Sequence, residues 1–229
     1  YENSYSNCHY LSVWDFKYNY NCGNDPARYG HIIRAISAND VTYGFAATRW
    51  SPYSIASAPR SKNGEIANNY QKNLYWEALD THAGQNLSFH DNKTEGWTGI
   101  AIVSCPNEAS VHTYAPLFFD VKNNFHDSGF NDGSCSYGIT FAGAESGTPG
   151  TIVELATGSI IGNTIYRAGN SEQKHGATYI HDTKGLRIKD NQIIECATDG
   201  IQLYHDNYLA NVSDNFFEEL WSNASSTPF

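Results

Sequence analysis

The chain has 229 residues, of which 40% are apolar and 17% charged, so it is long enough for one sizeable folded domain and is not a disordered chain. Its formal net charge of −10 at pH 7 gives no electrostatic footprint for nucleic acid, and no apolar run is long enough for membrane insertion. Methionine is absent and the chain opens at Tyr1, so we expect a fragment of a longer protein.

A repeat runs along the chain, in which an apolar β-forming residue is followed three residues later by Asn. The intervals between successive Asn residues range from 23 to 39, which suits coils of a stacked β-structure with or without a loop insertion. In chain order, the repeated pairs are Ile66 and Asn69, Phe89 and Asn92, Val121 and Asn124, Ile160 and Asn163, Ile188 and Asn191, and Val212 and Asn215.

Short strands of a second type are predicted between these pairs, each opening at or near a Gly that is followed by alternating apolar residues. No long window carries an apolar stripe with the helical period, so we expect few helices. The predicted strands of this type are 29–33, 43–47, 99–102, 138–141 and 200–203.

Strands this short cannot bury a core alone, so the coils must stack and pair in parallel. An Asn at the same bend of each coil can then bond its equivalents in adjacent coils, about 4.8 Å away. We therefore interpret the repeated Asn residues as structural. A sandwich of antiparallel hairpins would instead show turns roughly every 8–12 residues and no such register, so we reject it.

A resemblance to a known family rests on the stretch 76–84, which contains Leu-Asp-Thr-His and leads into Asn-Leu-Ser-Phe at 86–89. Together with the Asn repeat, it resembles the right-handed parallel β-helix of the pectin-lyase-like superfamily, especially the pectate-lyase-type coils of phage tail proteins. Ala83 stands where those coils commonly have Gly. The resemblance implies an all-β fold, with a single-stranded right-handed parallel β-helix and loop insertions over residues 1–222. Residues 223–229 would begin a connection to a following segment.

Three histidines share one position of the repeat, because His82, His181 and His205 each precede a repeated Asn by ten residues. We expect His181 and His205 on consecutive coils, stacked roughly 5 Å apart. The row either fills a polar corner of the coil or faces a groove as a functional row. The pattern favours metal binding only weakly, because no third His or carboxylate can be placed beside the pair at a certain distance, and the five cysteines have no zinc spacing. We therefore expect no metal site and no cofactor.

Two aspartates accompany this row, since Asp182 and Asp206 directly follow His181 and His205. Carboxylates about 5 Å apart should have split pKa values, with one raised toward an acid role, and this spacing suits a retaining glycoside hydrolase. The alternative is a pair of solvated turn residues. We take both aspartates and the three histidines as candidate catalytic residues.

A second acid–histidine group consists of Glu77, Asp80 and His82, on one predicted strand. Alternation places Glu77 on one face with Leu79, and Asp80 and His82 on the other face with Ala78. If Ala78 points inward, Asp80 and His82 form a buried pair that bonds the turn backbone. In the other interpretation they supply an acid or base at the lip of a groove. Both interpretations stay open.

Aromatic side chains are candidate sugar platforms, because Trp and Tyr pair an apolar face with a hydrogen-bonding edge. A cationic group on a predicted strand could meet a uronic acid carboxylate. The candidate substrate-binding residues are Trp50, Trp97, Tyr114, Tyr204 and Arg187.

The resemblance implies a phage tailspike-like domain that binds and cleaves a bacterial surface polysaccharide, as a homotrimer in a virion tail or otherwise outside the cell. A glycoside hydrolase needs two carboxylates, either Asp182 with Asp206 or Glu77 with Asp80. A polysaccharide lyase or epimerase acting on uronic acids is the alternative, disfavoured by 14 Lys and Arg against 24 acidic residues. A non-catalytic receptor-binding β-helix is the third reading.

Overall fold

The computed structural model describes residues 3–6, 10–15, 32–34, 36–39, 43–48, 62–106, 112–129, 137–145, 151–168, 177–196 and 199–220. Every regular element in these ranges is a strand, which confirms the predicted all-β class. Among the described residues, no helix is long and apolar enough to cross a membrane.

A sheet of seven parallel strands carries the apolar residues of the Asn repeat. The residues aligned side by side in it are Ile33, Ile66, Phe89, Val121, Ile160, Ile188 and Val212, so the predicted register is confirmed. In spatial order, its strands are β3 (Ile32–Arg34), β6 (Lys62–Ala67), β8 (Gln85–His90), β12 (Phe119–Lys122), β17 (Gly158–Ile161), β20 (Arg187–Lys189) and β23 (Asn211–Ser213).

A second sheet of 13 parallel strands consists of two rows, joined because its long strands β7 (Tyr70–His82) and β9 (Lys93–Val103) run through both. Besides β7 and β9, the first row contains β1 (Asn3–Ser6), β4 (Ile36–Asn39), β13 (Phe125–Asp127), β18 (Thr164–Tyr166), β21 (Gln192–Ile194) and β24 (Phe216–Glu218). The second row contains β2 (Tyr10–Asp15), β5 (Tyr43–Thr48), β14 (Ile139–Ala142), β19 (Thr178–Lys184) and β22 (Ile201–Tyr208).

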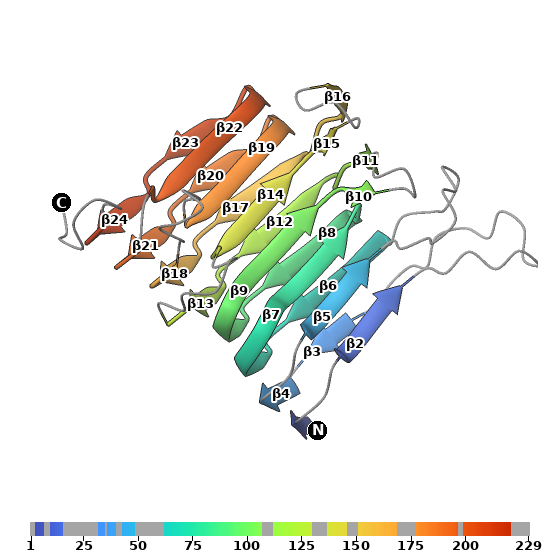
Figure 1. Cartoon of the computed structure of the whole chain (residues 1–229), viewed down its shortest axis with the longest axis vertical. Coiled ribbons are helices and arrows are strands. Elements are labelled where there is room, and N and C mark those ends of the chain that lie inside the picture. The colour runs from blue at the N-terminus through green and yellow to red at the C-terminus, as the bar shows by residue number, and fades with distance from the viewer. Residues whose placement is uncertain are drawn as a thin grey trace, which may run out of the picture.

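From β6 onward the chain visits the seven-stranded sheet, the first row and the second row in that order, and then repeats the order. Figure 1 shows the second row, from β2 to β22, side by side with the seven-stranded sheet behind it. Two antiparallel pairs are inserted between repeats, β10 (Cys105–Pro106) with β11 (His112–Tyr114) and β15 (Ala144–Glu145) with β16 (Ile152–Glu154). Parallel strands in curled sheets are compatible with a parallel β-helix.

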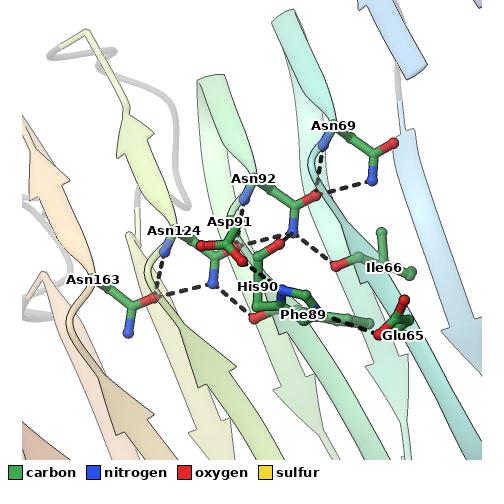
Figure 2. A network of polar contacts seen from close by, with 9 residues as sticks. All are labelled: Glu65, Ile66, Asn69, Phe89, His90, Asp91, Asn92, Asn124 and Asn163. Carbon is green, nitrogen blue, oxygen red and sulfur yellow. Dashed lines mark hydrogen bonds and ion pairs between the residues drawn. The ribbon is translucent and has the colours of Figure 1, made fainter. Parts of the chain in front are cut away.

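The repeated Asn residues form a hydrogen-bonded ladder at the bend between the seven-stranded sheet and the first row (Figure 2). At each step the side-chain amide donates to the side-chain oxygen of the next Asn over 2.8–3.0 Å. The amide of Asn124 also donates to the carbonyl of Phe89 in the preceding repeat, over 2.9 Å. The ladder, which confirms the predicted alignment, consists of Asn69, Asn92, Asn124, Asn163, Asn191 and Asn215.

The interior is filled by the aligned apolar residues, of which Ile66, Phe89 and Ile188 are at most 1% exposed. Full burial of one such side chain stabilises the fold by about 1.5–3 kcal/mol. At the β22–β24 end the same lines reach the surface, and Leu203 and Phe217 are each 44% exposed. The core of the described residues therefore runs from Phe45 of β5 to Cys196, just after β21.

One interior line of the first row is polar and passes through Gln71, Thr94 and His126. Both ring nitrogens of His126 have hydroxyl partners, Thr94 Oγ1 at 2.8 Å and Ser128 Oγ at 2.9 Å. Burial lowers the pKa of His126 to about 4, although the charge of Asp127 opposes the shift. This histidine is therefore neutral and structural at pH 7.

Candidate functional site

The outer side of the second row carries most of the predicted catalytic residues. Leu79 and Thr81 of β7 are fully buried, and Leu79 aligns with buried Ile100, so we infer that these two residues face the core. By alternation, Asp80 and His82 then face outward. Their side chains are 14% and 35% exposed, which rules out the interpretation as a pair inside the core.

Asp80 shares a register line with an aromatic residue three strands away. The line runs from Asp80 through Ala101 and Thr140 to Tyr179, and then to Gln202 at the edge. Three strand steps span about 14 Å. Small side chains therefore separate an acid on β7 from an aromatic ring on β19, on the same side of the same sheet.

The predicted histidine row is only partly realised. His82 aligns with Val103, and on the neighbouring strands Ala142 aligns with His181. His181, however, aligns with Tyr204 and not with His205. The register shifts between His181 and Thr183, where a β-bulge sets two residues of β22 against one of β19. The expectation that His205 stands on the same line was wrong by one residue.

This bulge also separates the two predicted aspartates. Asp182 has a φ of 54° and His205 a φ of 53°, so both residues have left-handed backbone conformations. Such a conformation interrupts the regular alternation of side chains along a strand. The Asp182 side chain is fully buried, whereas Asp206 is exposed. The two carboxylates therefore occupy different environments, and the like-charge pair inferred from the repeat does not describe them.

Asp182 instead belongs to a cluster with Glu145, His181 and His205. Asp182 Oδ2 lies 2.6 Å from His181 Nδ1 and 3.9 Å from His205 Nδ1. His205 Nδ1 lies 2.6 Å from Glu145 Oε1. Asp182 Oδ1 is buried without a hydrogen-bond partner. The arrangement gathers two carboxylates and two imidazoles at the corner where the second row ends.

A row of tyrosines lies beside this cluster. Tyr179 is 5.9 Å from Tyr137 and 6.0 Å from Tyr204, measured between ring centroids. The Tyr179 ring is also 5.5 Å from that of His181, and Tyr204 is 3.9 Å from His205. The pKa of Tyr179 is raised, first by burial and then by the charges of Tyr204, Glu145 and Asp182. The tyrosines and the cluster thus form one continuous aromatic and polar surface.

On β7, Glu77 and Asp80 interact electrostatically. Burial, and after it the charge of Asp80, raise the pKa of Glu77 to about 8. Burial also raises the pKa of Asp80, while His82, whose Nε2 lies 3.6 Å from Asp80 Oδ1, lowers it. Glu77 Oε2 is buried and has no hydrogen-bond partner. Glu77 is therefore protonated at neutral pH, but it lies on the side of β7 that faces the core, with Leu79 and Thr81, and not on the side of Asp80.

The remaining predicted binding residues do not join one surface. Trp97 is half-buried on β9, next to the residue that aligns with Glu77, and Tyr114 is half-buried on β11. Arg187 is exposed on β20 in the seven-stranded sheet. Trp50 lies outside the described residues. Only Tyr204 of the predicted aromatic residues falls in the tyrosine row.

Sequence reasoning missed Glu145, Tyr137 and Tyr179. Glu145 lies on an inserted strand, outside the repeat, so no spacing pointed to it. Tyr179 alternates with the core residues Thr178 and Ile180 on β19, and this alternation was a usable signal. Comparison with known protein families, curated proteins and solved structures gives no match for this chain.

Proposed function

We propose that the protein binds a bacterial surface polysaccharide on the outer side of the second row and cleaves it as a glycoside hydrolase. The observation that carries the proposal is the register line from Asp80 to Tyr179, which puts an acid and an aromatic platform on one side of one sheet. A sugar chain lying across the strands would stack on Tyr179 and Tyr204 and reach Asp80 and His82.

In this proposal Asp80 and His82 divide the chemistry of hydrolysis, because both face the outer side of the second row. The Asp80 carboxylate acts as base or nucleophile, and His82 donates a proton to the leaving oxygen. Glu77 lies on the other side of β7 with Leu79, so it acts on Asp80 only through its electrostatic interaction with that residue. His82 supports the charged form of Asp80. His82 Nδ1 lies 3.1 Å from the Ser104 carbonyl, and a hydrogen bond there fixes the orientation of the ring.

The wider setting follows from the sequence resemblance, which the all-β parallel architecture supports at the level of fold. We propose a right-handed parallel β-helix of the pectin-lyase-like type, acting as a tailspike-like domain of a phage virion. A homotrimer is part of the same proposal. Its test is the mass of the purified chain in solution, and a monomer at micromolar concentration would contradict it.

Product analysis with host surface polysaccharide tests the function. We expect new reducing ends from the wild type, and at least about a hundredfold slower cleavage from Asp80→Asn and from His82→Gln, the scale of lost acid–base catalysis. Tyr179→Ala should weaken binding, whereas Tyr208→Ala, at an exposed tyrosine outside the row, should not. Full activity in both the Asp80 and the His82 variant would refute the assignment.

The same assay separates the alternatives. Unsaturated products would indicate a polysaccharide lyase. Inverted configuration at a sugar carbon without cleavage would indicate an epimerase. Saturable binding without any product would indicate a receptor-binding domain. In that last case Tyr179→Ala would still weaken binding, and the Asp80 and His82 variants would leave it unchanged.

A further inference from the structure

We propose that Glu145, His181, Asp182 and His205 form a binding site for one divalent transition-metal ion of the zinc type. The sequence alone predicted no metal site, because no third ligand from another part of the chain could be placed at a certain distance from the two histidines. The structure supplies it, since Glu145 of β15 reaches the histidines across the end of the second row. This inference does not rest on the proposed function.

The geometry of the four side chains suits a single ion. One ligand atom from each residue can be chosen so that all four lie within 4.8 Å of one another. A tetrahedral site with metal–ligand distances near 2.0–2.1 Å separates its ligand atoms by roughly 3.4 Å. The shortest contact in the cluster, 2.6 Å, and the 4.8 Å limit lie on either side of that value. The four ligand atoms are therefore spaced on the scale of a single tetrahedral site.

A second and independent observation is the state of Asp182. Its side chain is 0% exposed, and its Oδ1 atom is buried without a hydrogen-bond partner. An unpartnered buried carboxylate oxygen costs free energy, which a bound cation would recover. The other three side chains are 19–26% exposed, so solvent and ions can reach the cluster.

The backbone around the cluster is built to bring these groups together. The β-bulge at Asp182 sets this residue against His205 on the neighbouring strand. On the other side, a Cβ added to Gly143 would lie 2.7 Å from the Asp182 Cβ and 2.1 Å from its carbonyl oxygen. Glycine at 143 therefore allows the close approach of β19, and Glu145 follows two residues later.

The ligand types select the class of metal. Two imidazoles with two carboxylates suit zinc, manganese, iron or cobalt, whereas calcium and magnesium prefer oxygen ligands alone. Two carboxylate charges also match the charge of a divalent ion. Without a metal, the cluster could instead be balanced by protonated histidines, as simple ion pairs. The experiment must therefore separate metal binding from ion pairing.

The test is a titration of the metal-free protein in the absence of any polysaccharide. The chain is stripped with EDTA, dialysed, and titrated with Zn²⁺, Mn²⁺, Ca²⁺ or Mg²⁺ by calorimetry, and the bound metal is counted by mass spectrometry. We expect one tightly bound Zn²⁺ per chain. A roughly hundredfold excess of Ca²⁺ or Mg²⁺ should not displace it. Zinc should also raise the melting temperature.

Glu145→Gln and His205→Gln should each weaken zinc binding at least about tenfold, and circular dichroism checks that both variants fold. His90→Gln is the matched control, because His90 also contacts two carboxylates, Glu65 at 3.3 Å and Asp91 at 2.6 Å, outside the cluster. Absent binding, binding equal in the cluster variants and wild type, or displacement of zinc by Ca²⁺ would each overturn the proposal. Cleavage assays do not enter this result, so either proposal can fail alone.

Discussion

Replacing Glu77 by Gln should change how the stability of the protein depends on pH. Burial raises the pKa of Glu77 from an ordinary value of 4.5 to about 8. Between these two values the unfolded chain has lost the proton and the folded chain keeps it, so the free energy of unfolding falls as the pH rises. Glu77→Gln removes this dependence, because an amide has nearly the shape of the protonated acid and does not titrate.

The magnitude follows from the width of the window. Each pH unit changes the free energy of unfolding by about 1.4 kcal/mol, so the upper limit between pH 4.5 and 8 is roughly 5 kcal/mol. Partial solvent contact of Glu77 reduces the expected effect to about 2–4 kcal/mol. The variant should thus match the wild type near pH 5 and exceed it by that amount near pH 8.5.

Urea unfolding of both proteins at pH 5 and 8.5 measures the effect. Glu218→Gln, at an exposed carboxyl of β24, is the control and should follow the wild type at both values. Parallel changes in the wild type and Glu77→Gln would refute the raised pKa of Glu77.

Two further predictions concern the interior. The pKa of His126 is about 4 in the folded protein and 6.5 in the unfolded chain, so the free energy of unfolding should fall as the pH drops through this window, by about 3 kcal/mol at most. His126→Gln should abolish that loss, as measured by urea unfolding. Asn191→Leu removes the side-chain oxygen that accepts from the backbone N–H and the side-chain amide of Asn163, and it removes the amide that donates to Asn215. It should lower the unfolding free energy by about 1–3 kcal/mol, whereas Asn211→Leu, at an exposed Asn, should change it far less.

The fold could be predicted in outline because its periodicity is carried by residue type. An Asn that bonds its equivalents in neighbouring repeats must recur at each bend, and an apolar residue three positions earlier must recur in the core. Insertions change the spacing between repeats from 23 to 39 residues without disturbing this pair. Counting from the Asn residues therefore located the strands of the seven-stranded sheet.

The candidate site could not be predicted by counting from the Asn residues, because it lies where a β-bulge interrupts the repeat. Ten residues separate both His181 and His205 from their Asn residues, yet a bulge moves His205 one position off the line of His181. Successive side chains of a strand point to opposite sides, so a shift of one residue places the two aspartates differently. Asp182 is buried, and Asp206 is exposed. Equal spacing in sequence does not ensure equal register once one strand gains a residue.

The corner position explains why the two acid–histidine groups differ. Ala83 follows His82 and Asp182 follows His181, each with a left-handed φ close to 55–60°. With Ala at this corner, Asp80 is the one carboxylate within ion-pair distance of His82 among the described residues, which suits proton transfer. With Asp at this corner, and Gly143 making room beside it, a buried carboxylate meets two histidines and Glu145, which suits an ion. The difference between Ala83 and Asp182 at the same corner of the repeat thus distinguishes the proposed catalytic group from the proposed metal site.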